Sequence, residues 1–348
     1  MKKGRTWTKV FIIFGIVLLV AAVALFVCGM SIADWDFGKL STVRYKQKEY
    51  TLDTEEEIES LTVRYSDAKV EIVYAADAQT AHISYPVRID AADNEIAEVV
   101  ILAEDGALSI EEKLDGRYDW FNWDLSSPAV TVTLPADTAC ALDIRINNGT
   151  VVLTGERAVA APSVSLYTDN GTLCAAPAGG LTVTGDTTLT TQNGTIKADG
   201  LAAGGTVTLD NKNGTISASN VSAAALSADL ENGNITLENV RVDGALTVKN
   251  SNGNISMRGS VKAQSFTADT ELGTIAVETG GILDAETLQL SSNLGDITVR
   301  GALAGSQADY TLFLTANMGS SNLPSGGSGA RRLTAATELG NITLRFEN

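Results

Sequence analysis

Apolar and polar residues alternate in a unit of about 21 residues that recurs ten times after residue 140. Each unit centres on a glycine, taken here as position 0, and apolar residues fill positions −5, +2 and +4 in 29 of 30 cases. The 44% hydrophobic content alone would place about 13 there. The ten glycines are Gly149, Gly171, Gly194, Gly214, Gly233, Gly253, Gly273, Gly295, Gly319 and Gly340.

Apolar residues two positions apart are typical of short strands with one buried face. Each unit therefore predicts a strand, a glycine turn, a second strand and a loop. The same frame extends toward the N-terminus, with Ala68 and Gly106 at position 0. We expect one repeat domain over residues 60–348, with an insertion at 111–129 and caps at 36–60 and 341–348.

Two folds share this pattern. Asn-Gly between alternating strands is a strong hairpin signal, so stacked antiparallel β-hairpins are one interpretation. The last four units, however, carry Leu272, Leu294, Met318 and Leu339 at position −1. A type I′ hairpin requires positive φ at both central residues, whereas a solenoid corner requires it only at the glycine. We therefore predict an all-β protein, a parallel β-solenoid (β-helix) of about 20-residue coils, with the hairpin stack as the alternative.

The N-terminal segment has a different pattern. Residues 10–30 contain no charged side chain, and a helix of this length spans about 32 Å, enough for a bilayer core. We expect a cytoplasmic stub at 1–9, one transmembrane helix at 10–30, and a linker with an N-terminal cap at 31–59. Lys2, Lys3, Arg5 and Lys9 precede the helix, which places the repeat domain outside the cell. A cleaved signal peptide is the alternative.

Charge and composition narrow the function classes. The net charge is −17, and beyond the first 30 residues 21 cations face 42 acids, a net charge of −21. Such a surface repels nucleic acid. His82 is the only histidine, which argues against histidine-based metal sites and Ser–His or Cys–His catalysis. We expect no cofactor and no metal site.

Two groups of side chains are candidate sites. The aromatic residues Tyr118, Trp120, Phe121 and Trp123 could stack on a sugar or insert into a partner surface, or the loop could fold over the open side of the solenoid. Position −4 reads Asp210, Asp229, Lys249 and Asp269 over four successive units. In an in-register stack these side chains lie about 5 Å apart. Two carboxylates at that spacing could serve glycoside chemistry or hold a cation, whereas a solvated charge ladder is the simpler interpretation.

A family resemblance rests on the strand at 130–135, the segment 142–144, Asn148-Gly149-Thr150-Val151 and the Asn-Gly-x-Ile units that follow. Together these resemble the bacterial "putative adhesin" family, a β-strand-repeat domain of unknown function that includes LiaG-like envelope-stress accessory proteins. The resemblance covers residues 60–348 and implies a single-span anchor and no catalytic residues. Two features depart from the family pattern: the apolar residues at position −1 of the last four units, and the insertion at 111–129.

These observations predict a non-enzymatic, membrane-anchored extracellular repeat protein of a bacterial envelope, with a role in adhesion, surface binding or structure. Its partners would be the membrane and a cell-wall polymer, an envelope protein or a host surface. An accessory protein in envelope-stress signalling is one alternative. A carbohydrate-active β-helix enzyme that uses Asp210 and Asp229 is another.

Overall fold

The computed structural model describes residues 3–32, 35, 43–52, 57–90, 92–114 and 128–347, with side chains from residue 14 onward. The chain forms two compact units. Unit 1 comprises Met1–Lys48, Pro86–Glu98 and Lys113–Ser127. Unit 2 comprises Glu49–Tyr85, Val99–Glu112 and Pro128–Asn348.

Unit 1 contains one long helix, α1 (Lys3–Ile32). Its stretch Phe14–Ser31 is long and apolar enough to cross a membrane, as in a membrane anchor or a signal sequence. The side chains along this stretch are largely exposed, Leu25 to 74%. The remainder of unit 1 includes an ion pair of 2.6 Å between Lys48 Nζ and Glu95 Oε1.

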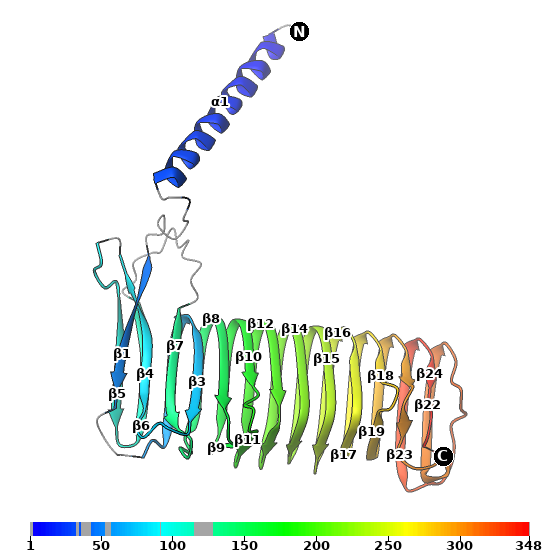
Figure 1. Ribbon diagram of the computed structural model, residues 1–348. Helices are drawn as coiled ribbons and strands as arrows, with labels where there is room; N and C mark the ends of the chain where they lie inside the picture. Colours follow the sequence, from blue (N-terminus) through cyan, green and yellow to red (C-terminus); the bar gives the residue numbers. More distant parts are fainter. Residues whose placement is uncertain are drawn as a thin grey trace. The chain divides into compact units, whose positions relative to one another are not determined.

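Unit 2 is a parallel β-solenoid, and its coils follow one another from β8 to β19 in Figure 1. Its N-terminal part contains β1 (Arg44–Thr51), β2 (Ser60–Asp67), β3 (Lys69–Ala75), β4 (His82–Ile89), β5 (Ala97–Glu104), β6 (Ala107–Leu114) and β7 (Ala129–Pro135). Strands β1, β4, β5 and β6 are each shared with unit 1. The coils contain β8 (Ala141–Gly155), β9 (Val159–Ala161), β10 (Val164–Ala175), β11 (Leu181–Val183), β12 (Thr187–Asp199), β13 (Leu201–Ala203), β14 (Thr206–Ala223), β15 (Ala225–Val242), β16 (Ala245–Asn252), β17 (Ile255–Leu272), β18 (Ile275–Val277) and β19 (Ile282–Leu294). The C-terminal elements are β20 (Ile297–Val299), β21 (Ala302–Leu303), a 3₁₀ turn (Gln307–Asp309), β22 (Tyr310–Met318), β23 (Arg331–Leu339) and β24 (Ile342–Thr343).

The glycine at position 0 forms a corner in each coil, and it pairs with the glycine of the next coil, as in Gly171 with Gly194. A Cβ at any of the ten corner glycines would lie only 1.6–2.1 Å from a carbonyl oxygen of the neighbouring corner. Nine of the ten also have φ between +135° and +157°; the exception is Gly319. Glycine is therefore required by close approach at every corner and by backbone conformation at nine.

Buried polar residues at position −3 hold the corners together. Five of the seven donate a hydrogen bond to the corner carbonyl of the preceding coil in their stack, for example from Asn211 Nδ2 to Gly194 O at 3.0 Å and from Ser292 Oγ to Gly273 O at 2.9 Å. Thr168 donates instead to the Asn147 carbonyl at 3.4 Å, and the Thr191 hydroxyl has no partner among the described residues. A buried carbonyl left without a partner would cost about 1–3 kcal/mol, so these side chains stabilise the stack. The seven buried residues are Thr168, Thr191, Asn211, Asn250, Thr270, Ser292 and Thr337.

The interior is filled by the apolar positions of the repeat. Leu189, Ile196 and Ala198 of one coil are all completely buried, and the same positions are buried in the coils on either side. The segment predicted as a loop contains a third short strand in several coils, such as β11, which pairs in parallel with β9 and β13. Each such coil therefore has three strands around its interior, because apolar residues such as Leu181 and Val183 also point inward there.

Parallel pairing between successive coils confirms the solenoid and excludes the hairpin stack for these strands. The corner at Ala68 is also confirmed, because Val70 pairs with Val151 and the Gly149 corner closes on the Ala68 carbonyl. The phase assigned to Gly106 was wrong. Leu108 after it pairs with Leu61 before the Ala68 corner, so β6 continues the first strand of the coil rather than the second.

The C-terminal end also differs from the expectation. Strand β23 lies between β19 and β22, and Ile342 of β24 pairs with Ile297, so the final segment is part of the stack and not its cap. The outer strand is β22. Its free edge is covered by the following loop, through paired backbone bonds of 2.8 and 2.9 Å between Leu312 and Gly326. Covering an edge in this way blocks strand addition by another chain.

Candidate functional site

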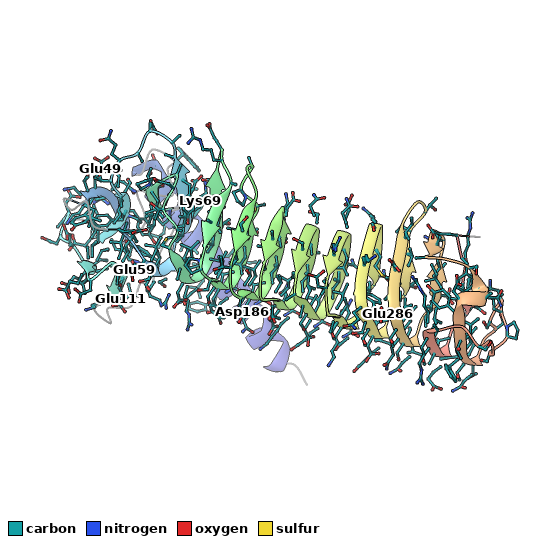
Figure 2. All side chains as sticks on the ribbon, turned by 90° about the horizontal axis from the view of Figure 1, so that it is seen from below. Glu49, Glu59, Lys69, Glu111, Asp186 and Glu286 are labelled. Atoms are coloured by element: carbon teal, nitrogen blue, oxygen red, sulfur yellow. The ribbon has the colours of Figure 1, made fainter. Side chains whose placement is uncertain are left out.

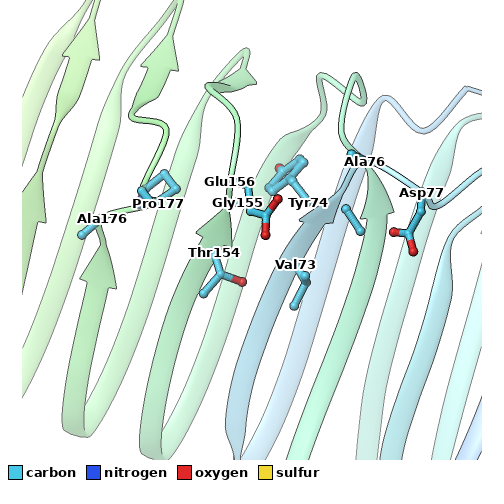
Figure 3. A pocket seen from close by; sticks show the side chains of 11 residues that line it. Val73, Tyr74, Ala76, Asp77, Thr154, Gly155, Glu156, Ala176 and Pro177 are labelled. Carbon is cyan, nitrogen blue, oxygen red and sulfur yellow. The ribbon is translucent and has the colours of Figure 1, made fainter.

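A pocket of about 660 Å³ opens where the second strands of three neighbouring coils end (Figure 3). Its walls are the end of β3 with the turn after it, the end of β8 with Glu156, and the turn between β10 and β11. Pockets that bind small molecules measure about 300–1,000 Å³, so this one has room for one sugar ring or a ligand of similar size. The lining residues are Val73, Tyr74, Ala75, Ala76, Asp77, Thr154, Gly155, Glu156, Ala176, Pro177 and Ala178.

Apolar groups form most of the pocket surface. Tyr74 is 4% exposed, and Pro177 is also buried. Thr154 contributes little polarity, because its hydroxyl donates to the Ile72 carbonyl at 3.2 Å. The ring and the proline therefore form the apolar floor of the pocket, and only a small part of either is accessible to a ligand.

Tyr74 and Cys140 remain neutral in this setting. Burial raises the pKa of Tyr74 far above its ordinary range, and the neighbouring Cys140 thiol adds to this. Burial likewise raises the pKa of Cys140 to about 11. Both groups therefore keep their protons near neutral pH, and neither is an activated nucleophile.

The rim of the pocket is acidic. The exposed side chains of Asp77 and Glu156 stand on it, and no lysine or arginine is among the residues that line it. Glu156 and Asp77 are both labelled among the lining residues in Figure 3. Carboxylates accept hydrogen bonds from hydroxyl or ammonium groups and repel anions. The pocket chemistry therefore fits a neutral or cationic ligand with one apolar face.

The structure brings the four residues of the predicted acidic face together. Asp210 pairs with Asp229, Asp229 with Lys249, and Lys249 with Asp269, each on the next coil. Partial burial and the nearby Asp229 carboxylate raise the pKa of Asp210. A lysine between carboxylates relieves their repulsion, which agrees with a solvated charge ladder; a ligand role for this face stays a prediction.

Charged side chains also project from turns elsewhere on the solenoid. Asp186 and Glu286, which belong to different coils, are both exposed and lie along the same edge in Figure 2. Within the described ranges, no group of three His, Cys, Asp or Glu side chains is placed to hold a metal ion.

The predicted aromatic site, Tyr118, Trp120, Phe121 and Trp123, lies outside the described residues. Sequence reasoning missed the pocket, because its walls come from three turns that share no motif. A usable signal was Pro177, a proline in a repeat turn at the position where the preceding unit has Gly155.

Comparisons with known proteins agree with this fold. The Toastrack DUF4097 family matches residues 58–345, which is most of the chain. A search of curated proteins found no significant match.

Several solved structures are similar. A putative adhesin from Bacteroides fragilis has 13% identity and a TM-score of 0.32, with 86% of this chain and 96% of that chain covered. A putative cell adhesion protein from Clostridium sporogenes has 6% identity and a TM-score of 0.26, with 87% and 100% covered. A putative adhesin from Parabacteroides distasonis has 11% identity and a TM-score of 0.24, with 75% and 96% covered. The family match confirms the resemblance found in the repeat motifs, and the chain belongs to the Toastrack DUF4097 family.

Proposed function

We propose that this chain is a non-enzymatic, membrane-anchored protein of a bacterial envelope, and that its extracellular solenoid binds a surface polysaccharide. The pocket beside Tyr74 is the observation that carries the proposal, because it combines the size of a sugar ring, an apolar floor and two hydrogen-bond acceptors. The neutral or amino sugars of a wall polymer or a host glycan have the chemistry that this pocket accepts.

The proposed topology follows from charge. The cations Lys2, Lys3, Arg5 and Lys9 precede the apolar helix, and the positive-inside rule retains such residues in the cytoplasm. The acidic solenoid then lies outside the membrane. A solenoid suits a surface-binding role, because its length grows coil by coil and each coil adds exposed surface.

The non-enzymatic part of the proposal rests on the candidate reactive groups. Tyr74 and Cys140 are held neutral by burial. Asp210 and Asp229 lie side by side on the outward face of adjacent parallel strands, beside Lys249 in the same row. Retaining glycosidases instead place two carboxylates on either side of a bound glycosidic bond.

The test is a binding array of glycans and cell-wall preparations, probed with the full chain in nanodiscs of zwitterionic lipid. Ala178→Trp fills the pocket from its exposed rim, and Glu156→Gln removes a rim carboxylate. Ala224→Trp is the matched control, an exposed alanine in a turn that does not line this pocket. We expect wild type and Ala224→Trp to bind the same class of neutral or amino-sugar polymer.

Ala178→Trp should weaken that binding by at least about tenfold, which corresponds to about 1.4 kcal/mol. The proposal is wrong if the wild-type chain binds no glycan or wall preparation, or if Ala178→Trp binds as tightly as wild type. Cleavage of a bound glycan that is lost in the Asp210→Asn, Asp229→Asn double variant would replace it with the enzymatic alternative.

A further inference from the structure

The corner position −1 changes character along the solenoid. In six units it is asparagine, and these side chains form a continuous ladder, with Nδ2 to Oδ1 distances of 2.8–3.0 Å between successive coils. The ladder contains Asn148, Asn170, Asn193, Asn213, Asn232 and Asn252. In the last four units the same position carries Leu272, Leu294, Met318 and Leu339.

These four side chains, called the apolar row below, are neighbours in space. Leu272 pairs with Leu294, Leu294 with Leu339, and Leu339 with Met318, and the row continues directly from Asn252. The three leucines are 44–46% exposed and Met318 is 73% exposed. At about 4.8 Å per coil the row is about 14 Å long.

The corner itself does not require apolar residues. Six coils of the same backbone register form it with asparagine, whose side chains bond to one another. Exposed aliphatic groups in a continuous row gain free energy when a partner covers them, because covering removes them from water.

The margins of the apolar row are acidic. Within four positions before and three positions after each of these corners there are four carboxylates and no lysine or arginine. The acids are Asp269, Glu271, Asp296 and Glu338. Among the described residues none of the four forms an ion pair, and Lys249, which pairs with Asp269 on the adjacent coil, offsets only the acid at one end of the row.

The acidic margins indicate which kind of partner could cover the apolar row. In a symmetric dimer through this row, the acids of one copy would face the same acids of the other, and like charges brought together are unfavourable. An anionic lipid surface would be repelled for the same reason. A partner segment with an apolar stripe and with lysine or arginine beside that stripe would cover the apolar row and also pair with the carboxylates at its margins.

The spacing of the row favours a helix over a strand. Side chains on one face of a strand recur about every 6.7 Å, so four of them span about 20 Å. One face of a helix recurs about every 5.4 Å, so four contact points separated by three turns span about 16 Å, close to the 14 Å of the row. A helix laid along the solenoid axis can therefore contact all four side chains.

We propose that the apolar row is a docking site for a cationic amphipathic helix of a partner protein. It is a separate surface from the sugar pocket and does not depend on the proposed glycan binding. The apolar face of the helix covers Leu272, Leu294, Leu339 and Met318, and its flanking cations lie beside Glu271 and Glu338.

The probe is a fluorescent 15-residue peptide of leucine and lysine with all leucines on one helical face. Binding is measured by anisotropy with the full chain in zwitterionic nanodiscs, after subtraction of empty nanodiscs. The test variant is Leu272→Asn, Leu294→Asn, Met318→Asn, Leu339→Asn, which extends the existing asparagine ladder. The control variant, Leu102→Asn with Leu114→Asn, removes exposed leucines from β5 and β6, outside the row. Far-UV circular dichroism verifies the fold of both.

We expect wild type and the control variant to bind the peptide alike, and the test variant to bind at least tenfold more weakly. A peptide with glutamate in place of lysine should not bind, and added salt should weaken the binding of the lysine peptide. Equal binding by wild type and the test variant would overturn the proposal, as would equal binding of the glutamate peptide or no binding of the lysine peptide.

Discussion

Replacing the corner glycine Gly214 by alanine tests the packing of the solenoid most sharply. The new Cβ would lie 1.8 Å from the Gly194 carbonyl oxygen and 2.8 Å from its carbon. Real Cβ atoms do not approach closer than about 3 Å, so the two coils must separate by more than about 1 Å. The Gly194 oxygen is also held by Asn211, and that hydrogen bond is strained by the same movement.

The expected cost has two parts. A non-glycine residue at φ of +135° costs about 1–3 kcal/mol. The weakening of two hydrogen bonds between coils adds about 1–3 kcal/mol at 0.5–1.5 kcal/mol each. We therefore expect Gly214→Ala to lower the free energy of unfolding by about 2–6 kcal/mol.

Gly280→Ala is the matched control, because Gly280 has φ of +81° but no atom within 4 Å of a new Cβ. It carries only the conformational penalty of about 1–2 kcal/mol. The assay is guanidinium unfolding of the full chain in micelles, followed by far-UV circular dichroism. Hydrogen exchange across residues 190–235 detects local opening, since coils of a solenoid can unfold separately. Equal costs for the two variants would refute the close-packed corner.

Three further predictions concern charges and the asparagine ladder. Burial and Asp229 raise the pKa of Asp210, so its ionisation opposes folding as pH rises through that pKa; Asp210→Asn should raise the melting temperature at pH 7, with the gain absent at pH 3. Ionisation of Asp284 has the opposite effect and stabilises the fold. Partial burial opposes its charge, but hydrogen bonds from Lys262 and Arg331 hold its pKa below the ordinary value. This stabilisation is present at neutral pH and is lost as pH falls through the lowered pKa. Asp284→Asn should therefore lower the melting temperature at pH 7, and an unchanged value would contradict the ion pairs of 3.0 and 2.8 Å. Asn193→Ala interrupts the ladder between Asn170 and Asn213 and should destabilise the chain by about 1 kcal/mol in urea unfolding; no change would mean that water replaces both hydrogen bonds without loss.

Much of the fold could be predicted from the sequence because the coil is defined locally. The corner glycine, the apolar positions around it and the polar residue three places before it all lie within ten residues, so one unit contains the whole corner. The switch from Asn252 to Leu272 at position −1 correctly favoured the solenoid, since the backbone needs freedom only at the glycine.

The wrong predictions concern strands whose pairing partner is not determined by nearby sequence. Any short strand with alternating apolar residues fits the frame in more than one phase, which is why Gly106 was placed wrongly while Leu108 pairs with Leu61. The insertion of β23 between β19 and β22 depends on which edge a late strand joins, and alternation carries no information about that.

The candidate sites were predictable to different degrees. The row of Asp210, Asp229, Lys249 and Asp269 follows directly from a constant register, and the structure places these residues accordingly. The pocket beside Tyr74 depends on three turns meeting in space. No spacing in the sequence encodes that meeting.

Attachment of living cells tests the central claim, surface binding through the Tyr74 pocket, most directly. A strain without this chain, and the same strain supplied with wild type, Ala178→Trp or Ala224→Trp, is passed over a surface coated with the polymer that the array identifies. The account predicts that attachment is lost in the deletion and restored by wild type and Ala224→Trp but not by Ala178→Trp. Attachment of the deletion strain at the wild-type level, or full restoration by Ala178→Trp, would contradict it.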